Sequence, residues 1–125
     1  MKKLFLTMCL TAMLSTSAIA ACNGGTEYTV DGDTFCISNI NLNWWSTATW
    51  CKANGMHLAT IYEVCPDWDG NTGSGKCGRT FPVTTDCWIA TVQSDQLAFY
   101  VTPSEGYVSF NTHYWASTYR ALCAN

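Results

Sequence analysis

The pattern of apolar and polar residues just before the middle of the chain predicts a helix. Asn43 can cap its start, because an asparagine side chain accepts a hydrogen bond from the first turn. The inward face would consist of three residues at the i, i+4, i+7 spacing of one helical face: Trp44, Ala48 and Cys51. Gly55 would end the helix, since glycine readily takes the left-handed conformation found there.

A second, shorter helix is predicted a few residues later. The run Thr60-Ile61-Tyr62-Glu63 is a capping box, in which Thr60 and Glu63 can satisfy each other's backbone amides through their side chains. Pro66 has no amide hydrogen and disfavours a helical residue before it, so the helix must end there.

The rest of the chain alternates between strand patterns and turn residues. Asp31-Gly32 is a hairpin turn signal between two short apolar runs. Residues 65–87 contain prolines and several glycines and are predicted to form a loop. Four further strands are predicted at residues 87–92, 97–102, 107–112 and 119–123, the middle two joined by the four-residue turn 103–106. This order predicts an α+β fold with two helices packed on antiparallel strands.

The first twenty residues resemble an export signal and not part of a fold. Two lysines, an apolar run and small residues up to Ala20 are the three parts of a secretory signal peptide, residues 1–20. The alternative is a bacterial lipobox ending at Cys22, which would make Cys22 a lipid anchor; this is disfavoured because Cys22 has a use in a disulfide. Residues 21–125 are then predicted to form a single domain, and no later apolar run approaches the ~18 residues that span a bilayer.

Charge excludes some classes of partner. Removing the two signal-peptide lysines leaves four basic residues against nine acidic ones. Such a surface does not attract polyphosphate, so neither nucleic acid nor anionic lipid is expected as a partner. Charged residues are few while Trp, Tyr, Asn, Thr and Ser are many, which is typical of secreted β-rich modules. The predicted location is exported: periplasmic, secreted or on the cell surface.

Seven of the eight cysteines follow the signal peptide, which indicates a disulfide framework with one thiol left over. A hairpin turning at Asp31-Gly32 would bring Cys22 and Cys36 together. The pairing of the loop cysteines stays open: Cys65 could bond Cys77, or Cys65 could bond Cys87.

Several of these residues, in this order, resemble the C-type lectin-like domain. The resemblance covers residues 22–123 and includes small bacterial exported members of unassigned function. The residues that carry it are Trp50-Cys51 in the first helix, Gly55, Leu58-Ala59 before the second helix, Trp88-Ile89-Ala90 in place of a Trp-Ile-Gly-Leu motif, and a final Leu122-Cys123.

The resemblance implies two disulfides, Cys22 with Cys36 and Cys51 with Cys123, and it implies that Trp50 and Trp88 are buried. The sugar-binding members share a calcium ion through Glu-Pro-Asn or Gln-Pro-Asp and Trp-Asn-Asp triplets, and this sequence contains neither. Calcium-dependent sugar binding by that route is therefore not expected.

Metal sites and cofactors are not predicted. Asp67, Asp69 and Asn71 alternate oxygen ligands as a calcium loop does, but glycine falls at the seventh place and no glutamate closes the loop. His57 and His113 are isolated in the sequence, so a zinc site has even less support than a calcium site.

Catalysis is not predicted either. The chain has no nucleophile elbow, metalloprotease helix or phosphate-binding glycine loop. The one alternative is a thiol-dependent enzyme with Cys87 as nucleophile and His113 as base.

Exposed aromatic residues near the C-terminus are the best candidates for a ligand face. Residues 111–119 are rich in the Tyr, Ser, Thr and Asn that adaptable binding surfaces use, and lectin-like proteins diversified by retroelements vary their surface near this end. Trp45 and Trp68 also lie next to turns or polar residues. The predicted ligand-binding residues are Tyr107, His113, Tyr114, Trp115 and Tyr119. The predicted function is a non-catalytic binding module, with carbohydrate binding or adhesion to a protein as its activity; the alternative is a structural subunit of a surface assembly.

Overall fold

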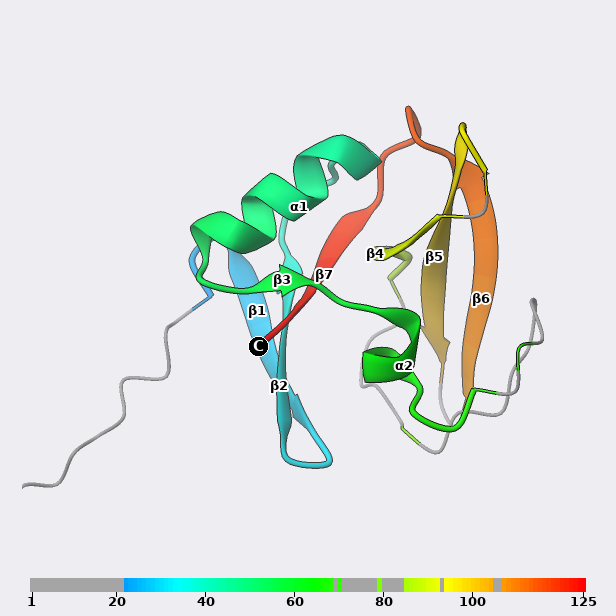
Figure 1. The fold of residues 1–125 in the computed structure, drawn as a ribbon. Helices are drawn as coiled ribbons and strands as arrows, with labels where there is room; N and C mark the ends of the chain where they lie inside the picture. The colour runs from blue at the N-terminus through cyan, green and yellow to red at the C-terminus, as the bar shows by residue number, and fades with distance from the viewer. Residues whose placement is uncertain (1–21, 69, 71–78, 80–84, 93, 105–106) are drawn as a thin grey trace, which may run out of the picture.

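The computed structural model describes residues 22–68, 70, 79, 85–92, 94–104 and 107–125, with the backbone alone for 102–112 (Figure 1). Its elements, in chain order, are β1 (Gly25–Val30), β2 (Asp33–Ser38), α1 (Trp44–Ala53), β3 (His57–Leu58), α2 (Ile61–Val64), β4 (Cys87–Val92), β5 (Leu97–Ser104), β6 (Tyr107–Tyr114) and β7 (Arg120–Ala124).

Most of the regular structure is a single mixed sheet in the order β1-β2-β7-β4-β5-β6, with β3 also paired to β7. Strands β4 and β7 are parallel, with Cys87 opposite Arg120 and Trp88 opposite Ala121. The two helices have only ten and four residues. The prediction of an α+β, C-type lectin-like fold with helices packed on antiparallel strands is therefore wrong. Local patterns gave the strands, but the direction of the β4–β7 pair depends on contacts between distant residues.

Helix α1 begins and ends as predicted. The Asn43 side chain accepts a hydrogen bond from the Ser46 amide at 3.0 Å, and Gly55 has a φ of +70° just beyond the helix. The predicted inward face is wrong at one position, because Ala48 is exposed and Thr47 is buried instead. The Thr47 hydroxyl donates to a carbonyl of its own helix, which satisfies its polar group inside the core.

The capping box of α2 is confirmed. The Glu63 amide donates to the Thr60 hydroxyl at 3.2 Å, and the Thr60 amide donates to Glu63 Oε1 at 2.9 Å. The helix ends at Val64, before Pro66, as the sequence predicts.

The N-terminal hairpin is also confirmed, and its turn explains the Asp-Gly pair. Asp31 and Gly32 have φ values of 50° and 85°, the positive pair that a two-residue type I′ turn requires. Val30 and Asp33 close the hairpin as register partners.

The second hairpin is longer than predicted. Pro103 pairs with Val108 and Ser104 with Tyr107, so the predicted four-residue turn is wrong and only residues 105–106, which lie outside the described residues, separate the strands. Strand β4 has the predicted bounds, whereas β7 begins one residue later than predicted.

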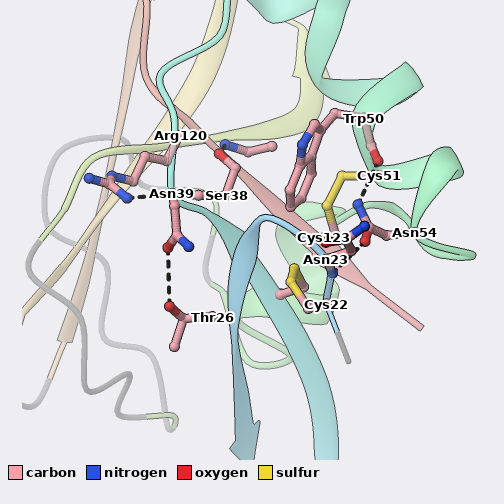
Figure 2. Close-up of a disulfide and its surroundings, with 12 residues drawn as sticks. Cys22, Asn23, Thr26, Ser38, Asn39, Trp50, Cys51, Asn54, Arg120 and Cys123 are labelled. Carbon is pink, nitrogen blue, oxygen red and sulfur yellow. Dashed lines mark hydrogen bonds between the residues drawn. A yellow bond between two sulfur atoms is a disulfide. The ribbon is translucent and has the colours of Figure 1, made fainter. Parts of the chain in front are cut away.

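Two disulfides link the described elements, one within the N-terminal hairpin region and one between α1 and β7. Figure 2 shows the bridge between α1 and β7, with Cys22 close to it. Cys22 bonds Cys36 and Cys51 bonds Cys123, as predicted. Cys36 and Cys123 are direct partners in the β2–β7 register, so the two bridges lie side by side. Cys65 is also disulfide-bonded, and its predicted partner, Cys77, lies outside the described residues.

The hydrophobic core lies between the sheet and the segments that cover it. Trp88 and Ile89 on β4 are completely buried, whereas Trp50 is only partly buried against the disulfides. The largest fully buried side chains are Trp88, Phe35, Ile89, Leu122, Val64 and Val101.

The predicted signal peptide, residues 1–20, lies outside the described part of the chain. Neither described helix is long and apolar enough to cross a membrane.

Candidate functional site

An open groove is lined by residues from the start of α1, the β4–β5 turn and the β6–β7 connection. These three segments lie along the upper side of the ribbon in Figure 1. Its volume is about 450 Å³, within the range of ordinary ligand sites. We call it the aromatic groove; its lining residues are Trp45, Asp95, Gln96, Tyr114, Trp115 and Ala116.

Backbone hydrogen bonds hold the three segments of the groove together. The Trp44 amide donates to the Trp115 carbonyl at 3.1 Å, and the Trp115 amide donates to the Gln96 carbonyl at 3.1 Å. Both bonds depend on backbone atoms, so side-chain substitutions at the rim leave them in place.

The inner wall of the groove is a stack of tryptophan rings. Trp115 stacks on Trp44 with ring centroids 5.3 Å apart, and it meets Trp45 nearly at a right angle, with centroids 5.2 Å apart. Trp44 is fixed in turn, because its Nε1 donates to the Ile89 carbonyl at 3.0 Å. Nε1 of Trp115 is buried and has no hydrogen-bond partner within the described residues. Because its ring packs against both Trp44 and Trp45, Trp115 is mainly a supporting wall.

The outer wall consists of two exposed rings and a polar rim. Trp45 is 54% exposed and Tyr114 is 60% exposed. Asp95 and Gln96, both exposed, supply a carboxylate and an amide beside these rings. A second hollow of about 420 Å³ shares Asp95, Gln96 and Tyr114 with the groove, so the hollowed surface extends past Tyr114.

The predicted ligand residues do not all meet. Tyr114 and Trp115 line the groove, but His113 and Tyr119 belong to a separate ring cluster. Tyr107 pairs with Ser104 at the far end of β6, about 23 Å along the strand from Tyr114 at the usual rise per residue.

The second ring cluster is built into the structure. Tyr119 stacks on Tyr100 and meets Trp88 edge to face, each with centroids 4.8 Å apart. His113 Nδ1 shares a 2.6 Å hydrogen bond with the Ser117 hydroxyl. Burial raises the pKa of the Tyr119 hydroxyl, with smaller contributions from Tyr100 and Asp86. These contacts indicate a packing role for Tyr119.

Asp95 and Gln96 are not among the ligand-binding residues predicted from the sequence, and Trp45 was predicted only to lie next to turns or polar residues. The available signal was the polar run Ser94-Asp95-Gln96 between two predicted strands, which indicates a turn. That this turn meets the start of α1 follows only from the sheet order.

The weak metal candidates gain no support. Asp67 is exposed, and its Oδ1 lies 3.6 Å from the sulfur of the disulfide-bonded Cys65, while Asp69 and Asn71 lie outside the described residues. The described ranges contain no group of three or more His, Cys, Asp or Glu residues placed to hold a metal ion.

Cys87 is the unpaired cysteine among those the structure describes, and it is completely buried. Burial, together with the charge of Asp86, raises the pKa of its thiol to about 12, against an opposing effect of Arg120. The thiol donates to the Thr85 carbonyl at 3.3 Å, whereas His113 bonds Ser117. A thiol held in its neutral form is a poor nucleophile, so this geometry does not favour the Cys87–His113 pair.

No protein-family model matches the sequence, and no curated protein is significantly similar to it.

Proposed function

We propose that the chain is an exported, non-catalytic binding module that holds a glycan or protein ligand in the aromatic groove. The observation that carries the proposal is the pair of exposed rings, Trp45 and Tyr114, on a groove that also presents a carboxylate and an amide. Aromatic rings with polar groups beside them provide large contact area and direction at once, and such residues dominate binding energies at interfaces.

The rigidity of the inner wall supports a binding role. Trp44 and Trp115 are packed and hydrogen-bonded before any ligand arrives. A ligand would therefore not have to order these rings, and preorganisation of this kind increases affinity.

Two observations support the remaining parts of the proposal. Disulfides such as Cys22–Cys36 and Cys51–Cys123 form and persist in oxidising compartments, which supports export. The buried, neutral thiol of Cys87 supports binding without thiol catalysis.

The test is binding of the purified protein to arrays of immobilised glycans and cell-surface proteins, with calcium and with chelator. Replacing Trp45 and Tyr114 together with alanine should weaken binding to an array partner at least tenfold, because both rings lie on the outer wall. Trp115 is a poorer choice for substitution, since its ring packs between Trp44 and Trp45.

Tyr62→Ala is the matched control, because Tyr62 is also 60% exposed but packs against Trp68, away from the groove. It should bind like the unmodified protein. No partner on either array, or equal binding by the double variant, would contradict the proposed function.

A further inference from the structure

We propose that the aromatic groove binds a trimethylammonium group, the cation of choline. This inference rests on the proposed function and names the chemical group that the site accepts. It follows from rings at right angles, an exposed tyrosine and a carboxylate that line the same groove: Trp45, Trp115, Tyr114 and Asp95.

Ring geometry is the first argument. The planes of Trp45 and Trp115 meet at 83°, so the two indoles form a corner and not a flat platform. Trp115 is in edge-to-face contact with Trp45 and is stacked on Trp44, so the ring surface that a ligand can reach belongs mainly to the exposed Trp45 and Tyr114. A cation beside these rings is attracted by their π faces, and tryptophan gives the strongest attraction of the three aromatic residues.

Charge is the second argument. Asp95 is the charged residue that lines the groove. The basic side chains of the described residues are not part of the groove lining: Lys52 is in the last turn of α1, Arg79 pairs with Asp33, and Arg120 donates to the Ser38 carbonyl. The groove therefore favours a positive ligand, and the acidic excess of the whole chain acts in the same direction.

The third argument distinguishes a quaternary ammonium from a lysine-type cation. A primary ammonium has three N–H donors and is strongly hydrated, so a largely aromatic lining would leave donors unpaired. A trimethylammonium group has no N–H, and its methyl groups can pack directly against Trp45 and Tyr114. Few polar side chains, chiefly Asp95 and Gln96, line this groove, and this lining suits a trimethylammonium group better than a primary ammonium.

The size of the site allows a larger ligand to carry this group. The groove of about 450 Å³ is continuous, through Tyr114, with the neighbouring hollow that Ser94 and Leu97 line. The trimethylammonium head would occupy the tryptophan corner, and the remainder of the ligand would extend past Tyr114.

The experiment is a titration of the full chain with choline, followed through the indole N–H resonances of the tryptophans in NMR spectra. Trp45 and Trp115 resonances should shift in a saturable way. The key comparison is 3,3-dimethylbutan-1-ol, which has the shape of choline without its charge and should bind at least fivefold more weakly. Phosphocholine, run in parallel, distinguishes a free choline-type ligand from one carried on a phosphate ester.

Two variants complete the design. Asp95→Asn should weaken choline binding roughly fivefold and leave the neutral isostere unchanged, while Trp45→Ala should abolish choline binding. Tyr62→Ala again serves as the control and should bind choline normally. Equal binding of choline and the neutral isostere would overturn this inference and leave the proposed function standing. The same conclusion would follow if an array partner bound through Trp45 while choline caused no response. No array partner together with no response to choline would overturn both.

Discussion

Glu63 connects the second helix to the chain that precedes it. Its carboxylate accepts from the Thr60 amide and lies 2.8–2.9 Å from Nε2 of His57. Burial acts to raise the pKa of Glu63, but the hydrogen bonds from Thr60 and His57 together outweigh it, and the pKa is lowered from the ordinary value of 4.5. The ionised form of Glu63 therefore stabilises the folded chain.

The pH dependence of stability follows from that direction. A carboxyl whose folded pKa is lowered contributes stability above its unfolded pKa and loses it as the pH falls through the folded pKa. We expect Glu63→Gln to keep the capping geometry but remove this contribution. The difference in unfolding free energy between the protein and the variant should be largest near pH 7 and shrink below pH 4.5.

Urea denaturation from pH 7 to pH 3 measures this difference. Glu27→Gln is the control, since it removes the same charge from β1. A difference for Glu63→Gln that stays constant over the whole pH range would contradict the proposed role of the ionised carboxylate.

The residues of the groove show how far a sequence can predict a site. The placement of Tyr114 and Trp115 on the groove was accessible to prediction, because aromatic residues in a segment rich in Tyr, Ser and Thr are typical of binding surfaces. Asp95 was not, because an aspartate in a turn is ordinary and only the sheet order places it beside α1. His113 and Tyr119 lie close in sequence to Tyr114, yet they pack against Tyr100.

At the scale of elements, local chemistry predicted the boundaries well. The Asn43 cap, the Thr60 capping box and the Asp31-Gly32 turn all involve residues within a few positions of each other, and all are confirmed. The orientation of α1 was less accessible. Its buried face depends on where Cys51 meets Cys123, far along the chain, and this places Thr47 inward and Ala48 outward.

Gly25 allows the first strand to approach the Cys22–Cys36 bridge. A Cβ atom at this position would lie 2.5 Å from the Cys22 sulfur, 2.6 Å from the Ile37 carbonyl oxygen and 2.9 Å from the Cys36 sulfur. No side chain fits there without displacing the bridge or the strand.

We therefore expect Gly25→Ala to hinder formation of this disulfide. The Cys22–Cys36 bridge closes a loop with a sequence separation of 14 residues. Loss of such a bridge would cost about 3 kcal/mol of unfolding free energy. Thiol counting by mass spectrometry and chemical denaturation measure the two effects. Gly55→Ala is the control: its Cβ would meet nothing, and only the positive φ is strained, which costs about 1 kcal/mol. A fully oxidised, equally stable Gly25→Ala protein would refute the steric argument.

At the scale of the whole molecule, the sheet order was the part that the sequence did not predict. Strand β7 pairs with β2 on one side and with β3 and β4 on the other, so it is the centre of the fold although it comes last in the chain. Each of these pairings joins segments far apart in sequence. Apolar patterns indicate that such a strand is buried, but they carry no information on its neighbours or on their direction.

The adjacent disulfides have a mechanical consequence. Tension applied between Cys22 and Asn125 would pass through the Cys22–Cys36 bridge, along the chain from Cys36 to Cys51, and then through the Cys51–Cys123 bridge. The chain between Cys51 and Cys123, which holds Asp95 and Tyr114, would carry no force. Of the residues that line the groove, Trp45 lies on the stretched segment, and Asp95, Gln96, Tyr114, Trp115 and Ala116 do not.

Single-molecule pulling would reveal this division. The oxidised protein should lengthen by at most about 50 Å, because only some 15 residues can extend. After reduction it should lengthen by about 360 Å, as the whole described span becomes free to extend. A long extension of the oxidised protein would contradict the bridge arrangement. In a tethered molecule, force would thus withdraw Trp45 from Tyr114 and release a bound ligand while most of the sheet stayed folded.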